Sequence, residues 1–216
     1  MDSSAPDDTP KEAALTGVTY SEAVRTPCFY LFFIGIVVLG MVIAIANFSS
    51  AFWTAGGMDP AVAATNFSLL TLFGGLIMLS GGFMVNKLGT RGYVTLLVVV
   101  YLIGIISGLV WLGSGARALA ILMALGFSVA TVITGTPSLF VNDCFGNRDY
   151  ARIASTGSAA FYIGSAATTI ITGRIATVAG YKVMLIYLGC IAVIALVLLF
   201  LATAMSPMRQ SKNGIK

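Results

Sequence analysis

The side chains best able to bind a small molecule in this sequence are hydroxyls spaced along one apolar stretch. Between residues 153 and 178, six of them recur at alternating steps of three and four: Ser155, Ser158, Tyr162, Ser165, Thr169 and Thr172. That spacing places them on one face of a helix. The stripe could hydrogen-bond a polar solute, or it could serve helix packing, because small hydroxyl residues let membrane helices approach closely.

Polar residues in three other apolar stretches extend this pattern. Asn47 lies in the first stretch of the chain, Asn66 and Thr71 lie in the second, and Thr131 lies in the fourth. Because polar atoms must point at protein or water and not at hydrocarbon, we expect these stretches to surround a common space. The predicted substrate-cavity residues are therefore Asn47, Asn66, Thr71, Thr131, Ser158, Tyr162, Ser165 and Thr169.

Groups suited to catalysis or metal binding are missing from the same stretches. The chain has no His, the commonest metal ligand and proton relay. No Asp or Glu falls near the middle of an apolar stretch, and Cys28, Cys144 and Cys190 are scattered without a metal-binding or disulfide spacing. The sequence therefore predicts no enzyme activity, no catalytic residue, no metal and no cofactor.

Two further residues are candidate gates. Pro137 should kink or break its helix, because proline removes one backbone hydrogen bond and clashes with the preceding turn. Broken helices line binding sites or gates in transporters, although a plain structural kink gives the same pattern. Arg174 lies roughly 33 Å along its helix from Arg152 at 1.5 Å per residue, which places it at the opposite membrane interface. There it is either a gate residue or an arginine that extends to the head groups.

These residues are set in a very apolar chain. Of its 216 residues, 58% are hydrophobic and 9% are charged, against roughly 45–50% and about 25% in soluble domains. Apolar runs of about 20 residues are long enough to cross a bilayer. The sequence predicts an all-α integral membrane protein, a bundle of six transmembrane helices, near Cys28–Ala51, Ala61–Val85, Tyr93–Leu112, Ala118–Phe140, Ile153–Val178 and Val183–Met205.

The basic residues predict the orientation of this bundle. Positive residues collect in cytoplasmic loops, and nine of the twelve Lys and Arg fall on one side. We therefore expect a multi-pass protein of the cytoplasmic (inner) membrane with both termini in the cytosol. The same rule explains the net charge of +4 without a nucleic-acid partner. The nine are Lys11, Arg25, Lys87, Arg91, Arg148, Arg152, Arg209, Lys212 and Lys216, and the other three are Arg117, Arg174 and Lys182.

The chain divides into three predicted parts. Residues 1–26 are polar and lack the basic start and apolar stretch of a signal peptide, which predicts a soluble leader that is disordered up to about Thr19. Residues 27–206 make the transmembrane bundle. Residues 207–216 make a basic cytosolic tail.

The segment GGFMVNKLGTRG, residues 81–92, lies between the second and third predicted helices. It resembles the signature loop of the major facilitator superfamily. Asn86 stands where the family pattern has Asp, which weakens any charge pair built there. The glycines permit a tight turn, and the two cations suit an anionic leaflet. The matching positions are Gly82, Asn86, Lys87, Gly89 and Arg91.

Two more segments are similar to prokaryotic oxalate/formate-antiporter-like and monocarboxylate-type members of that superfamily. SEAVRTPCFYLFF resembles the start of their seventh helix, and TPSLFVNDCFGNRDYARI resembles their loop between the tenth and eleventh helices. The resemblance covers nearly everything after Tyr20 and implies the C-terminal six-helix half of such a fold. It also implies that the first, second, fourth and fifth helices line the cavity. The third and sixth, which lack polar stripes, are then peripheral.

The resemblance implies a secondary transporter that works by alternating access on a small organic solute, with a carboxylate as the first candidate. Met78 stands where carboxylate-carrying relatives often have Arg, so a partner half would have to supply the cation. One bundle cannot enclose a path, and we expect a homodimer or a pair with a second six-helix half. The alternative is a non-transporting six-helix fragment, or a regulatory or partner subunit of a split transporter.

Overall fold

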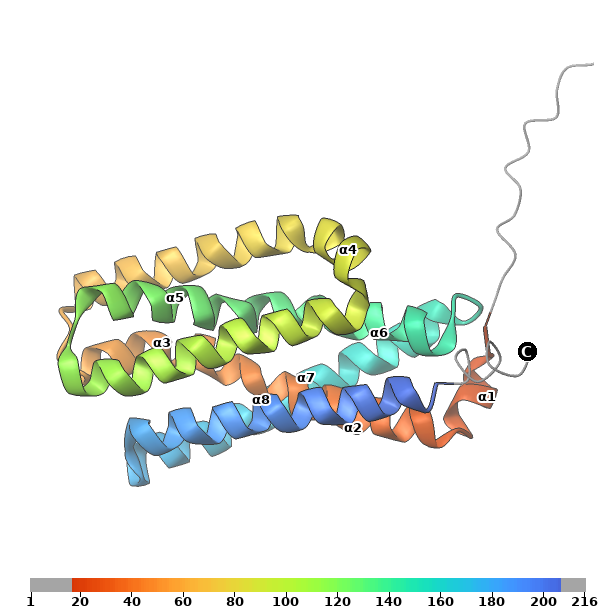
Figure 1. Cartoon of the computed structure of the whole chain (residues 1–216). Coiled ribbons are helices and arrows are strands. Elements are labelled where there is room, and N and C mark those ends of the chain that lie inside the picture. The colour runs from red at the N-terminus through yellow and green to blue at the C-terminus, as the bar shows by residue number, and fades with distance from the viewer. Residues whose placement is uncertain (1–16, 207–216) are drawn as a thin grey trace, which may run out of the picture.

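The computed structural model describes residues 17–206, and helices make up nearly all of them (Figure 1). Proline opens both α2 and α4 in the first helical turn, where its missing N–H is not needed. The elements are α1 (Tyr20–Val24), α2 (Pro27–Gly40), the 3₁₀ turn η1 (Met41–Ile43), α3 (Ala44–Ala55), α4 (Pro60–Ser114), α5 (Arg117–Val132), the 3₁₀ turn η2 (Ile133–Gly135), α6 (Thr136–Phe145), α7 (Tyr150–Val178) and α8 (Gly180–Ala204).

Within residues 17–206, four helical stretches are long and apolar enough to cross a membrane: Pro27–Ala55, Pro60–Ser114, Arg117–Phe145 and Gly180–Ala204. The expectation of an all-α chain with helices able to cross a membrane is therefore confirmed. The structure divides the chain differently from the six expected spans, because the second and third both lie within α4. The fifth lies in α7, which has 29 residues but is not among the four.

The helix α4 bends sharply at Gly89. Within Pro60–Ser114 the backbone leaves helical geometry at this residue, with φ 69° and ψ 167°, a region that is open essentially to glycine alone. The two limbs, residues 60–88 and 90–114, therefore run back along the bundle in opposite directions (Figure 1). The tight turn predicted from the glycines of the signature-like segment is confirmed at this position.

Replacing Gly89 by Ala should loosen this bend. A Cβ at these dihedral angles costs about 1–3 kcal/mol, and we expect the free energy of unfolding in detergent to fall by that amount. Gly82→Ala is the matched control, because Gly82 belongs to the same segment, carries no positive φ and has nothing within 4 Å of an added Cβ. Equal stability of the two variants would show that the bend does not depend on glycine.

Glycine also brings helix backbones into direct contact at two crossings. An added Cβ at Gly40 would collide with the carbonyl oxygen of Phe161, and one at Gly164 with that of Val37, so α2 and α7 cross backbone to backbone. The second limb of α4 crosses α5 in the same way at Gly104 and Gly126. Small residues allow this close packing between membrane helices.

The break predicted at Pro137 is confirmed. The turn η2 ends at Gly135 and α6 begins at Thr136, so that Pro137 falls in the first turn of a new helix. The Cβ atom of Pro137 also lies 3.5 Å from the position of a Cβ added at Gly157. The broken helix therefore packs closely on α7.

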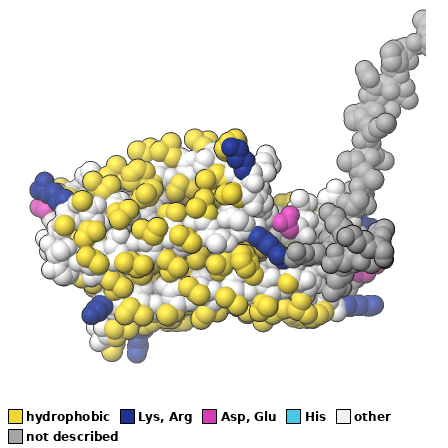
Figure 2. All heavy atoms as spheres, in the orientation of Figure 1, with side chains coloured by type: hydrophobic (Ala, Val, Ile, Leu, Met, Phe, Trp, Pro, Cys, Tyr) yellow, Lys and Arg dark blue, Asp and Glu magenta, His cyan; other side chains and the backbone are white. Residues whose placement is uncertain are grey.

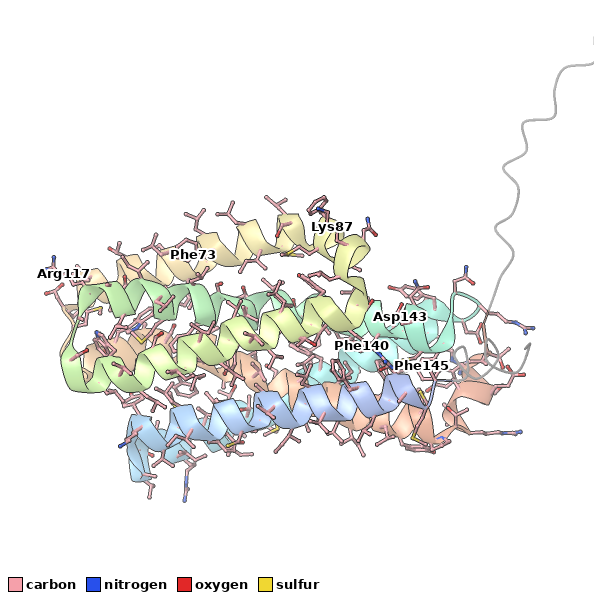
Figure 3. The ribbon with its side chains drawn as sticks, viewed as in Figure 1. Phe73, Lys87, Arg117, Phe140, Asp143 and Phe145 are labelled. Atoms are coloured by element: carbon pink, nitrogen blue, oxygen red, sulfur yellow. The ribbon has the colours of Figure 1, made fainter. Side chains whose placement is uncertain are left out.

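The two ends of the bundle carry most of the charge. On the face drawn in Figure 2, hydrophobic side chains gather along the length of the bundle, and Lys and Arg lie at both ends and also near the middle of the face. One end holds Arg117 (Figure 3), and the opposite end holds α1, the α6–α7 connection and the end of α8. There the Ser206 hydroxyl donates to the carbonyl oxygen of Cys144 at 2.9 Å. The expected leader and tail lie outside the described residues, apart from positions 17–26 of the leader.

Candidate solute-binding face

The helix α7 has one buried and one exposed face. Its buried residues are Ile153, Gly157, Ala160, Phe161, Gly164, Thr168 and Thr172. In the predicted stripe, Tyr162 is 65% exposed, Ser155 and Thr169 are exposed, and Ser158 and Ser165 are half-buried. Thr172 is buried instead and shares a hydrogen bond of 3.1 Å with Thr168. Most of the stripe thus faces outward from the chain.

Several hydroxyls on the predicted stripes already have partners in their own helices. Thr169 donates to the carbonyl oxygen of Ser165 at 2.9 Å, and Ser155 donates to that of Arg152 at the same distance. Thr71 donates to the carbonyl oxygen of Phe67 at 3.1 Å. A hydroxyl satisfied in this way can face an apolar neighbour at little cost. These three side chains therefore do not by themselves require a polar ligand.

Asn47 and Tyr162 differ from these hydroxyls. Both side chains are exposed, and neither makes a hydrogen bond to another of the residues that the structure describes. An amide or phenol without a partner costs several kcal/mol in hydrocarbon. Of the residues predicted for the cavity, Asn47 and Tyr162 therefore have the strongest need for water, a solute or another protein surface.

Asn66 is buried in the bundle, and Thr131 is half-buried at a helix contact. Asn66 is 6% exposed, and its amide nitrogen lies 3.1 Å from the sulfur of Met58. Thr131 packs against Gly74, at the contact between the first limb of α4 and α5. Its hydroxyl donates to the carbonyl oxygen of Ser128 at 2.7 Å. Both side chains thus have packing roles in this arrangement.

The first limb of α4 carries a wide, open groove of about 1030 Å³. Its surface is mainly apolar, and Leu79 is 85% exposed and Met78 is 67% exposed. Thr71 is the one predicted cavity residue among its lining side chains. The lining consists of Phe67, Ser68, Thr71, Leu72, Gly75, Leu76, Met78 and Leu79.

The cations of the signature-like segment pack on aromatic rings. The Lys87 ammonium lies 4.5 Å from the centre of the Phe83 ring beside the bend of α4 (Figure 3). The Arg91 guanidinium lies 6.0 Å from the ring of Phe200 in α8, which ties the bend to the last helix. The other candidate gate, Arg174, is exposed near the end of α7.

A crevice that the sequence did not indicate lies between α4 and α6, and several polar side chains belong to its lining. One part has a volume of about 430 Å³, and a neighbouring part of about 310 Å³ shares Val85 and Leu139 with it. Thr136 lines the second part, and its buried hydroxyl has no partner among the described residues. The polar lining of the larger part is Thr90, Ser138, Asn142, Asp143, Asn147 and Tyr150. These residues come together because α4 bends at Gly89 and because the turn η2 interrupts the helix before α6. The spacing of residues in the sequence does not reveal this contact.

No protein-family model matches the chain, and no curated protein matches it in sequence. A function for the chain therefore has to be inferred from the arrangement of its side chains.

Proposed function

We propose that the chain is one half of a major-facilitator-type secondary transporter and works as a two-bundle assembly, in its simplest form a homodimer. The main support is the exposed face of α7, where Tyr162 has no hydrogen-bond partner among the described residues. A second bundle placed against this face would enclose Tyr162 and Asn47 in a shared, hydrated cavity. Alternating access would then arise from rocking of the two bundles about that site.

The distribution of exposure supports a protein partner. The first limb of α4 buries only a narrow line of side chains: Ala63, Asn66, Leu70, Gly74 and Gly81. The helix α7 is similarly open and carries Arg152 and Arg174 within its length. Lipid can cover the apolar groove on α4, but it cannot satisfy the polar face of α7. A second copy offers both surfaces at once.

A homodimer suits the shape of these two surfaces. In a closed twofold arrangement the same patches meet twice, so that the groove on α4 of one copy can receive the small-residue edge of α7 of the other, while Tyr162 faces the cavity between the bundles. The exposed side of α7 includes the small residues Ser155, Ala159 and Ala166, which let another helix approach closely. The occupant of the groove is then a helix of the second copy.

The chemistry of the face favours a small organic solute recognised by hydrogen bonds. Asn47 offers an amide and Tyr162 a hydroxyl, and neither contributes a charge. A carboxylate would need a cation, and Met78 occupies the position at which similar transporters often carry Arg. A neutral polar solute therefore fits the face of a homodimer better than a carboxylate does.

Solute exchange in proteoliposomes tests this function. We expect the purified chain, reconstituted alone, to catalyse saturable exchange of at least one member of a panel of small neutral and carboxylate solutes. Tyr162→Phe removes only the hydroxyl, and it should lower exchange at least tenfold without changing the yield of folded protein. Exchange no faster than in protein-free liposomes would favour the non-transporting alternative.

A further inference from the structure

The short segment at the start of the described chain, residues 17–22, lies across the connection between α6 and α7. We propose that this segment is a strap that holds the connection in place and must be released before the ends of α6 and α7 can separate. Figure 1 shows α1 at the same end of the bundle as this connection. Release of the strap is a movement that can be measured directly, whether or not the chain transports a solute.

Backbone pairing fixes the first contact of the strap. Gly17 forms an isolated antiparallel bridge with Gly146, and the Val18 N–H donates to the carbonyl oxygen of Phe145 at 3.0 Å. Gly17 has a φ of 125°, and an added Cβ would collide with the Phe145 carbonyl oxygen. The bridge therefore requires glycine at position 17.

Side chains fix the second contact. The Tyr20 N–H donates to a carboxylate oxygen of Asp149 at 2.7 Å, and a charge-assisted bond of this kind is stronger than a neutral one. The Arg152 guanidinium lies 4.4 Å from the centre of the Tyr20 ring, within the range of a cation–π contact. The strap therefore holds both sides of the connection, the end of α6 and the start of α7.

The strap is itself held in shape by a capping box. The Thr19 N–H donates to the Glu22 carboxylate at 2.8 Å, and the Glu22 N–H donates to the Thr19 hydroxyl at 3.4 Å. The hydrogen bond from the Thr19 backbone lowers the pKa of Glu22 from its usual value of 4.5. The carboxylate therefore stays ionised at neutral pH, and the cap weakens only as the pH falls through this lowered pKa.

The strapped connection forms one wall of the crevice between α4 and α6. Asn147 lies in the connection, and Tyr150 is the first residue of α7. Both line the part of the crevice that has a volume of about 430 Å³. Asp143 and Phe145, labelled in Figure 3, lie on α6, with Asp143 lining the crevice and Phe145 buried. Movement of the connection away from α4 would widen the crevice. The strap thus controls whether this end of the bundle is open.

Cys144 reports on release of the strap, because it is fully buried and directly precedes Phe145. We expect Gly17→Ala and Tyr20→Ala to raise the rate of Cys144 alkylation by N-ethylmaleimide at least tenfold, measured by peptide mass spectrometry on the full chain. The same chain unfolded in sodium dodecyl sulfate gives the reference rate for a fully accessible Cys144. That reference rate should be the same in the variants and the wild type.

Gly57→Ala is the matched control for backbone strain. Gly57 has a φ of 89° and nothing within 4 Å of an added Cβ, and it lies outside the strap, in the turn before α4. This variant should leave the Cys144 rate at the wild-type value. Unchanged Cys144 rates in both strap variants, with helical content preserved, would overturn the proposal. Tyr20→Phe, which keeps the ring and the backbone bond, should behave like the wild type even if the larger changes impair folding.

Discussion

Gly164→Ala is expected to destabilise the bundle by about 3 kcal/mol, near the upper end of overpacking costs. The added methyl group would fall on the carbonyl oxygen of Val37, and Gly40 on α2 makes the reciprocal contact with α7. A backbone carbonyl cannot rotate away as a flexible side chain can, so the two helices would have to separate. Thermal unfolding in detergent, or titration with a denaturing detergent, measures the loss.

Gly113→Ala serves as the control for this prediction. Gly113 is also helical, but nothing lies within 4 Å of a Cβ added there. Exchanging glycine for alanine in a helix gains about 0.5–1 kcal/mol where space allows. The two variants should therefore shift stability in opposite directions, and a loss in both would mean that the α2–α7 crossing is not a special constraint.

Thr169→Trp is expected to abolish the two-bundle assembly while leaving the single bundle intact. Thr169 is exposed on α7, and its hydroxyl bonds only within its own helix among the described residues. The isolated chain can therefore accept a larger side chain at this position. Overpacking a contact costs typically 1–3 kcal/mol. A twofold dimer contains the substituted residue twice, so the dimer bears this cost twice. We expect the dimer fraction and the solute exchange to fall at least tenfold.

Val193→Trp is the control for Thr169→Trp, because it makes a comparable increase in side-chain size on α8, away from the exposed face of α7. Val193 is 43% exposed on α8, the helix that corresponds to the sixth predicted span, which was expected at the periphery. This variant should dimerise and exchange solute as the wild type does. If Thr169→Trp behaved in the same way, the exposed face of α7 would not be the contact between bundles.

The helices themselves were predictable because apolar runs of membrane length are encoded locally. The bend at Gly89 and the break at Pro137 were predictable for the same reason, since glycine and proline act on their own backbone. The number of separate spans was less evident, because α4 continues as a helix on both sides of Gly89. The sequence stripe on α7 predicted a helical face, but not which of its members would be buried.

The site was harder to predict than the helices. Asn66 and Thr131 have the same polar character as Asn47, yet packing buries Asn66 beside Met58 and leaves Thr131 half-buried against Gly74. The strap left one local signal, because Thr19 followed three residues later by Glu22 is a capping-box pattern. Its contact with Phe145 joins positions far apart in the chain. No local pattern encodes such a pairing.

The mass of the transport-competent particle tests the central claim most directly. The purified chain would be separated by size-exclusion chromatography in mild detergent, and each fraction would be both weighed by native mass spectrometry and reconstituted for solute exchange. We predict a species with the mass of two chains that carries the exchange activity, and a species of one chain that carries none. A stable single chain that exchanges solute at the full rate would contradict the account.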